Sequence, residues 1–213
     1  MPVITPCQTM RGHTGHVRSV VHIPGKRQII TCSADGSLRP WDLESGVQIG
    51  EGWRDENSAG LRSMALSPNG KIVASGGNDG KVRLWNVETR KVIAKWTAHT
   101  GVVCTLCWSA DGERVASGSW DGTTRIWNVN SGRTILAIKT GHNWVYVVMY
   151  SPDSSKLATG TGGDKDKAVK IWDAKTGELL NTPKYDGPLC TVRSLAWTSD
   201  GKLQAYVRII WLD

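Results

Sequence analysis

Five tryptophans end short runs of alternating apolar residues, and they recur at nearly one spacing. Trp41, Trp85, Trp127, Trp172 and Trp211 are separated by 44, 42, 45 and 39 residues. The runs read SLRPW, KVRLW, TTRIW, AVKIW and VRIIW. Internal similarity at this period is typical of repeat proteins, in which a unit buries its apolar face only against its neighbours. The sequence therefore predicts a repeat architecture.

Each tryptophan is preceded by further elements in a fixed order. An aspartate in a turn stands six residues earlier in four copies, as Asp35, Asp79, Asp121 and Asp166. Small, apolar runs come before these turns: IITCS, IVASGG, RVASGS and KLATGT. Earlier still, apolar residues spaced three and then two apart end in the turns SPNG, SADG, SPDS and TSDG. This alternation of strand-like apolar runs and turns predicts antiparallel β-hairpins.

This order of motifs resembles the WD-repeat (β-transducin-like) β-propeller family, over almost the whole chain. Three copies also open with Gly-His or a small-residue variant, at Gly12-His13, Ala98-His99 and Gly141-His142. The resemblance implies an all-β fold, a β-propeller of four-stranded blades around a central channel. Five WD repeats are recognised and the fifth is incomplete. We expect one domain with blades at about residues 11–50, 51–96, 97–140, 141–185 and 186–213.

The fifth repeat is too short for a complete blade. The stretch KLQAYVRIIWLD, from residue 202, has no room for a second strand, a turn and a third strand together. The segment VITPCQTM, residues 3–10, stands where the outer strand of a preceding blade belongs. Joining it to the last repeat closes the ring and removes the edge strands. The prediction is therefore a monomeric five-bladed ring closed by residues 3–10. If the ring does not close, the alternatives are a fragment of a longer propeller or a dimer.

The resemblance also implies a hydrogen-bonded network inside each blade, made by the leading histidine, a strand hydroxyl, the turn aspartate and the tryptophan. The sets are His13, Thr31, Asp35 and Trp41; His99, Ser117, Asp121 and Trp127; and His142, Thr159, Asp166 and Trp172. The second copy has Ser75, Asp79 and Trp85 but no histidine, and the fifth has only Trp211. Serine, histidine and aspartate together suggest a catalytic triad. Their repetition at one spacing predicts instead buried polar groups that satisfy one another, so no catalytic residue, metal or cofactor is expected.

Composition favours a soluble protein of the cytoplasm or nucleus. The 213 residues contain no apolar run near 18 residues, so no membrane partner is expected, and no basic-then-apolar amino terminus suggests secretion. The cysteine count is odd, at five. Cys104 and Cys107 are three apart in a predicted strand, where their side chains leave opposite faces. They are therefore expected to be free thiols.

One rim of the channel is the predicted binding surface. In the family, the residues that flank the first apolar residue of strand one, and the residue before the turn aspartate, point to the top face. The large or charged residues in these slots are Arg18, Arg62, Arg193, Tyr146, Trp144, Trp120, His16 and Lys165. Arginine and aromatic residues are enriched at protein interfaces, and guanidinium groups suit carboxylate or phosphate. This pattern predicts a protein or peptide partner with an acidic or phosphorylated segment.

The chain is therefore predicted to be a non-catalytic scaffold for protein–protein interaction. Its net charge of +7 leaves a nucleic-acid-binding module as an alternative. That alternative is less favoured because the lysines are dispersed and form no contiguous basic run. The third hypothesis is an enzyme with its site at the mouth of the channel. It is disfavoured because the sequence shows no carboxylate pair or metal cluster outside the repeated network.

Overall fold

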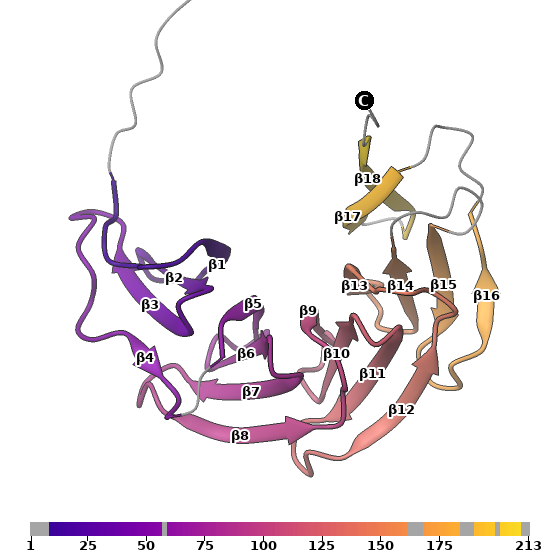
Figure 1. The fold of residues 1–213 in the computed structure, drawn as a ribbon, viewed down its shortest axis with the longest axis horizontal. Coiled ribbons are helices and arrows are strands. Elements are labelled where there is room, and N and C mark those ends of the chain that lie inside the picture. Colours follow the sequence, from indigo (N-terminus) through magenta and orange to yellow (C-terminus); the bar gives the residue numbers. More distant parts are fainter. Residues whose placement is uncertain (1–8, 57–58, 162–167, 184–189, 199–200, 210–213) are drawn as a thin grey trace, which may run out of the picture.

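The computed structural model describes residues 9–56, 59–161, 168–183, 190–198 and 201–209. These residues form five antiparallel sheets that follow one another along the chain and lie in an arc (Figure 1). The first strand of each sheet is innermost, and the last strand of each four-stranded sheet lies on the outer side (Figure 1). The predicted all-β propeller architecture is confirmed. In the described residues, however, the arc is open, with the first and fifth sheets at its two ends (Figure 1).

Four of the sheets have four strands, each paired with the next along the chain. The first sheet contains β1 (Val17–His22), β2 (Gln28–Ser33), β3 (Ser37–Asp42) and β4 (Trp53–Arg54). The second contains β5 (Leu61–Leu66), β6 (Ile72–Gly77), β7 (Lys81–Asn86) and β8 (Val92–Thr97). The third contains β9 (Val103–Trp108), β10 (Arg114–Ser119), β11 (Thr123–Asn128) and β12 (Thr134–Lys139). The fourth contains β13 (Val147–Tyr150), β14 (Lys156–Gly160), β15 (Val169–Asp173) and β16 (Leu179–Asn181).

The fifth sheet has two described strands, β17 (Cys190–Trp197) and β18 (Leu203–Ile209). The sequence pattern had aligned VRIIW with the third strands of the other repeats. The structure corrects that alignment, because most of this stretch lies in β18, which pairs with β17 as a second strand. The turn after Trp197 leads straight into β18, with Trp197 opposite Leu203, so no other strand separates them.

Small residues in the second strands allow neighbouring sheets to pack closely. A Cβ atom on Gly76 of β6 would lie 2.6 Å from Val103 of the next sheet. The same substitution at Gly118 would meet Val145 at 2.6 Å, and at Gly160 it would meet Val192 at 2.8 Å. These distances are shorter than a carbon–carbon contact allows. The small, apolar run in each repeat therefore exists because the first strand of the next sheet lies directly on it.

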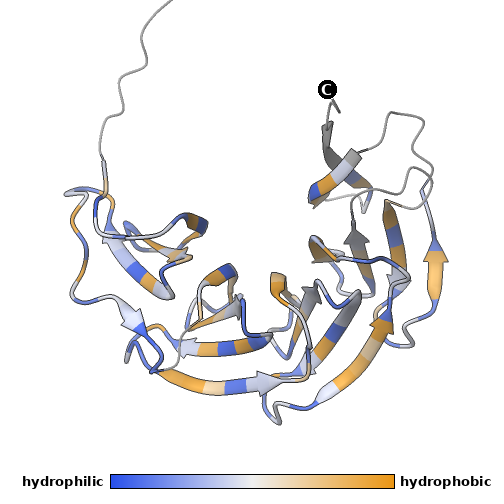
Figure 2. Cartoon of the chain, in the orientation of Figure 1, coloured by the Kyte–Doolittle hydropathy of each residue, from blue (hydrophilic) through white to orange (hydrophobic). Residues whose placement is uncertain are grey.

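In the described part of the chain, the hydrophobic core is divided into four clusters, each shared by two neighbouring sheets. Between the first and second sheets, for example, Ile30 and Trp53 pack with Met64 and Trp85. Figure 2 shows the apolar and polar residues interleaved along the strands that supply these clusters. Because each sheet buries its apolar residues against its neighbours, the sheets depend on one another for stability.

The first sheet lacks such a neighbour on its outward face within the described residues. Val17 and Val20 of β1 are 56% and 57% exposed, whereas the equivalent Val145 and Val148 are 0% and 2% exposed. Residues 3–8 of the predicted closing segment lie outside the described residues, and Thr9 and Met10 are not in a strand. Ring closure through residues 3–10 therefore stays a prediction.

The first blade extends past the boundary expected near residue 50. Backbone bonds join Asp42 N to Val47 O and Ile49 N to Pro40 O, so the chain begins to pair with β3 directly after the turn. Gly50 then takes a φ of +69°, a conformation that side chains other than glycine rarely adopt. The chain leaves the sheet there and rejoins it as β4, at residues 53–54.

The cysteine pair lies where the sequence predicted, in strand β9. The Cys104 thiol donates a hydrogen bond to the carbonyl of Val145, while Cys107 packs against the cluster shared by the third and fourth sheets. Both thiols are free. Burial raises the pKa of each to about 12 and keeps them protonated at neutral pH.

Candidate partner-binding surface

The polar network of the third sheet joins four side chains in one chain of hydrogen bonds. The indole N–H of Trp127 donates to the hydroxyl of Ser117 at 2.8 Å. That hydroxyl lies 2.7 Å from His99 Nε2, and His99 Nδ1 lies 2.8 Å from Asp121. A neutral histidine with its proton on Nδ1 satisfies every one of these groups. The pKa of His99 is lowered, because burial outweighs the attraction of the Asp121 carboxylate, which agrees with a neutral ring.

The first sheet contains the same arrangement. Trp41 donates to Thr31 at 2.7 Å, Thr31 lies 2.7 Å from His13 Nε2, and His13 Nδ1 lies 2.9 Å from Asp35. Burial alone would raise the pKa of Asp35. Hydrogen bonds from Ser37, Thr14 and His13 reverse that effect and hold the pKa well below its usual range. The network therefore contains an ionised carboxylate in a largely enclosed position.

The fourth sheet shows the indole half of the network, with Trp172 donating to Thr159 at 2.9 Å. His142 is buried at the expected place, and Asp166 lies outside the described residues. Trp211, the tryptophan of the fifth repeat, is outside them as well.

The second sheet replaces the missing histidine with an arginine. Trp85 still donates to Ser75 at 2.8 Å, but Asp79 pairs with Arg83, whose side chain is completely buried. Arg83 also binds Asp55 at 2.9 Å, and Lys95 binds the other oxygen of Asp55 at 2.6 Å. Burial alone would lower the pKa of Arg83, but the two carboxylates raise it above its ordinary value.

Sequence reasoning missed this charge cluster, although a signal was present. The position two residues before each tryptophan is basic in all four complete copies: Arg39, Arg83, Arg125 and Lys170. Where the histidine is absent, an ion pair between this basic side chain and the turn aspartate could have been predicted.

The geometry of the networks excludes the triad chemistry that serine, histidine and aspartate suggest. Ser117 has no exposed surface and its hydroxyl is already engaged by Trp127 and His99, so a substrate cannot reach it. Among the described residues, no group of three or more histidine, cysteine or carboxylate side chains could hold a metal ion. The repeated polar set is part of the interior.

Five of the predicted rim residues form one continuous chain of ring contacts, which we call the rim ladder: Arg62, Trp120, Trp144, Tyr146 and Arg193. The Arg62 guanidinium carbon lies 5.3 Å from the centre of the Trp120 ring. Trp120 and Trp144 have ring centres 6.3 Å apart, and those of Trp144 and Tyr146 are 6.1 Å apart. Arg193 completes the ladder 3.9 Å from the centre of Tyr146.

The ladder joins residues of four sheets. Arg62 belongs to β5 and Arg193 to β17, while Trp120 lies in the turn between β10 and β11. Trp144 and Tyr146 directly precede β13. Trp144 is half exposed and Trp120 about one-third exposed, and such aromatic surface beside cations is typical of binding sites.

The remaining predicted rim residues stand apart from the ladder. His16 and Arg18 belong to the first sheet and are exposed, and no ring contact or ion pair within the described residues links them to the ladder. Lys165 lies outside the described residues. Asn78, which precedes the turn aspartate of the second sheet, accepts a hydrogen bond from Arg62 Nε at 2.8 Å and so helps to orient that arginine.

Curated proteins with similar sequences cover only part of this chain. Pre-mRNA-processing factor 19 homolog 2 of Arabidopsis thaliana is 29% identical over 101 residues, which is 47% of this chain and 19% of the relative. The U3 snoRNP-associated protein-like EMB2271 of the same plant is 32% identical over 92 residues, 35% of this chain and 19% of the relative. The denticleless protein homolog of Xenopus tropicalis is 34% identical over 80 residues, 37% of this chain and 11% of the relative. The matched segments thus make up a fifth or less of each relative.

The sequence profile described as "WD domain, G-beta repeat" matches residues 4–42, 52–86, 90–128 and 133–173. Three of these four units begin at the outer strand of one sheet and end in the third strand of the next. The first begins at residue 4, before the first described strand, and ends in the third strand of the first sheet. Together the four units cover most of the sequence. The chain therefore belongs to the WD40 repeat family, whose members are scaffolds for protein interaction.

Proposed function

We propose that the rim ladder is the surface by which this scaffold binds an acidic or phosphorylated segment of a partner protein. The observation that carries the proposal is the ladder itself, in which arginines stand at both ends of three linked aromatic rings. Guanidinium groups bind carboxylate and phosphate through paired N–H donors. The exposed ring surfaces between them would bury apolar parts of the same segment.

The contacts that the arginines already make support this role. Stacking on Trp120 and Tyr146 restricts the side chains of Arg62 and Arg193 before any partner arrives. A restricted side chain loses less conformational entropy on binding. Arg18 and His16 extend the positive surface on the first sheet, and we propose that they contribute charge rather than ring contacts.

The nucleus is the compartment that we propose. Two of the relatives are named for pre-mRNA processing and for association with the U3 snoRNP. The described residues contain no helix long and apolar enough to span a membrane. We propose no chemistry for this chain, because the hydroxyl and histidine groups of the described networks are enclosed within the sheets.

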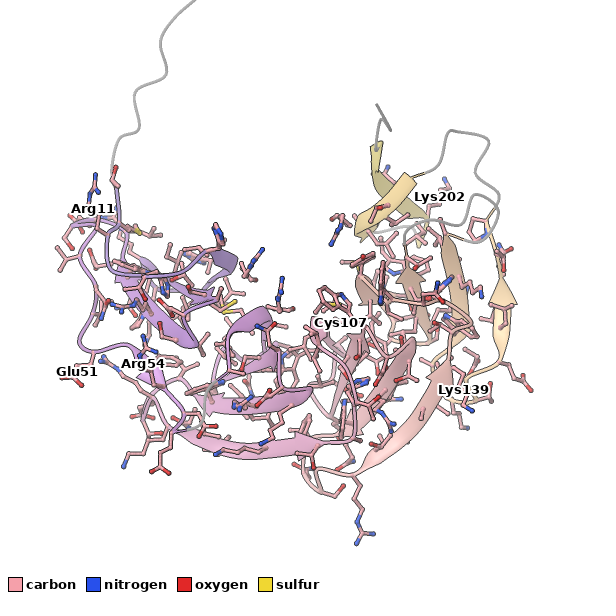
Figure 3. All side chains as sticks on the ribbon, viewed as in Figure 1. Arg11, Glu51, Arg54, Cys107, Lys139 and Lys202 are labelled. Atoms are coloured by element: carbon pink, nitrogen blue, oxygen red, sulfur yellow. The ribbon has the colours of Figure 1, made fainter. Side chains whose placement is uncertain are left out.

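The test uses an array of acidic peptides, each present with and without phosphorylation. Wild-type protein should retain a subset, and the double variant Arg62→Glu/Arg193→Glu should bind that subset at least about tenfold more weakly. The control is Arg133→Glu/Lys139→Glu, which has the same net charge change away from the ladder, and Lys139 lies on the outer side of the arc (Figure 3). Both variants should keep the wild-type melting temperature, since the substituted side chains lie outside the four core clusters.

Equal binding by the wild type and the ladder variant would contradict the proposal. The nucleic-acid alternative predicts another outcome. A single-stranded oligonucleotide would bind with an affinity that falls steeply as the salt concentration rises, and the ladder variant and its control would lose equal affinity for it.

A further inference from the structure

Four first strands contain a β-bulge near their beginning. In β5 and β17, for example, the pairing with the second strand shifts between Leu61 and Ser63 and between Val192 and Ser194. A bulge leaves one extra residue unpaired and turns its side chain out of the regular alternation of the strand. These strands are the innermost of their sheets (Figure 1). The extra residues are Arg18, Arg62, Cys104 and Arg193.

Two of these bulge residues, Arg62 and Arg193, lean toward each other along the arc; we call them the arginine pair. Arg62 belongs to the second sheet, and its guanidinium lies over Trp120 of the third. Arg193 belongs to the fifth sheet, and its guanidinium lies over Tyr146, directly before β13 of the fourth. The third and fourth sheets lie between the second and the fifth (Figure 1). Each arginine therefore reaches into the space between the two.

Cys104 is the bulge residue that lies between the arginine pair. Its thiol donates a hydrogen bond to the carbonyl of Val145 at 2.7 Å. Burial raises the pKa of this thiol to about 12, while the positive charges of Arg193 and Arg62 both act to lower it. The effect of a charge falls off with distance, so both guanidinium groups lie near the same thiol. The carboxylate of Asp121 acts on the thiol as well, but less than either arginine does.

Neither charge of the arginine pair is neutralised by a described residue. None of the ion pairs in the described part of the chain involves Arg62 or Arg193. Asn78 occupies only the Nε donor of Arg62, which leaves its terminal N–H groups. Ring stacking covers the flat face of a guanidinium, whereas its N–H donors point outward in the plane. The arginine pair thus presents two positive charges with unused donors.

The short side chain of Cys104 suits the binding of one anion by both arginines. The equivalent positions in the other sheets hold arginine or tyrosine, and a side chain of that length would stand between the guanidinium groups. A carboxylate has one negative charge and two oxygens. A phosphate monoester has close to two negative charges at neutral pH and three oxygens that accept hydrogen bonds. Phosphate therefore matches two guanidinium groups in charge and in the number of acceptors.

We propose that Arg62 and Arg193 together bind a single phosphoryl group beside Cys104, so that the rim ladder recognises a phosphorylated side chain in preference to aspartate or glutamate. This inference rests on the proposed function and specifies its ligand. The aromatic rings of the ladder contact the neighbouring residues of the same partner segment. The Cys104 thiol stays protonated and takes no covalent part.

The test uses the peptides that the array retains, each synthesised with phosphoserine, glutamate or serine at one position. Fluorescence anisotropy should show that the wild type binds the phosphoserine form at least about tenfold more tightly than the glutamate form. In Arg62→Gln and in Arg193→Gln, this preference should fall to less than about threefold. If the two arginines share one anion, the double variant loses much less affinity than the product of the two single losses.

Substitutions of Cys104 locate the anion. Cys104→Leu places a larger side chain between the guanidinium groups, so it should weaken binding of the phosphoserine form at least about tenfold. The control is Cys104→Ser, which keeps a short side chain with a donor for the Val145 carbonyl and should bind as the wild type does. Melting temperatures of both variants show whether the fold is intact, and the arginine variants test the same site without changing Cys104.

The outcomes separate this inference from the proposed function. The inference alone is overturned if the wild type binds the phosphoserine and glutamate forms equally, or if the two single losses multiply in the double variant. In either case, loss of binding in Arg62→Glu/Arg193→Glu would still support the ladder as the partner surface. An array that retains no peptide, or unchanged binding in the charge-reversed variant, overturns both.

Discussion

At the scale of single residues, repetition determined what the sequence could predict. The members of the His99 and His13 networks could be named because the same residue types recur at one spacing, and the structure contains the corresponding hydrogen bonds. The partners of Arg83 could not be named. Asp55 lies 28 residues earlier, directly after the outer strand of the first sheet, and none of the repeated motifs includes it. The ladder residues were predicted from their slots, whereas their ring contacts depend on side-chain rotamers that no pattern specifies.

The Arg83 cluster gives a prediction at the same scale. The variant Arg83→Met removes the buried countercharge that Asp55 and Asp79 share, so unfolding in urea should show a loss. Lys95 still pairs with Asp55 and Asp79 is partly exposed, so the loss should be about 3 kcal/mol, at the lower end for a broken buried pair. The control is Arg27→Met, which removes an ion pair with Glu44 whose side chains are 77% and 74% exposed. That change should cost less than about 1 kcal/mol. Similar losses in the two variants would show that Arg83 is not needed to balance the two carboxylates.

Acid should weaken the same cluster. Burial alone would raise the pKa of Asp79, but hydrogen bonds from Arg83 and the Lys81 backbone lower it in the folded protein. Because the pKa of Asp79 is lower in the folded than in the unfolded protein, its ionised carboxylate stabilises the fold at pH values above the unfolded-state pKa of about 3.9. That stabilisation is lost as the pH falls through the folded-state pKa. The stability difference between wild type and Arg83→Met should therefore shrink below about pH 4.

At the scale of strands and sheets, the spacing of apolar residues predicted the first strands correctly, but it could not predict which would be buried. Val20 and Val148 hold equivalent positions in β1 and β13. Val148 packs against the preceding sheet, and Val20 has no described sheet in front of it. Whether a first strand is buried depends on the sheet that precedes it, so the strand's own sequence does not encode its burial.

The two valines allow one substitution to be compared in two environments. Val148→Ala should destabilise the protein by about 1.5–3 kcal/mol, because it removes buried methyl groups and leaves a cavity. Val20→Ala should cost less than about 0.5 kcal/mol if the face of β1 is exposed in solution. The free energy of unfolding in urea measures both. Equal losses would indicate that another segment covers β1, as ring closure through residues 3–10 requires.

At the scale of the whole molecule, the fold class followed from the sequence. The period near 40 residues specifies one sheet per repeat, and the described residues form five sheets at that period. The shape of the arc did not follow. The angle between neighbouring sheets is set by side-chain volumes in each shared cluster, and small differences in this angle add up from one sheet to the next around the arc.

The sharing of each core cluster between only two sheets has a consequence for how the protein opens. Among the residues that the structure describes, the second, third and fourth sheets are each held by clusters on both sides, while the first and fifth are held on one. In such a linear array the free energy of local opening depends on nearest-neighbour contacts. Amide hydrogen exchange should therefore be slowest in β9 and β10 and progressively faster toward β1 and β18. Uniform exchange from one end to the other would mean that the protein opens as a single cooperative unit. Under a graded profile, the ends become accessible to proteases and chaperones while the middle stays folded.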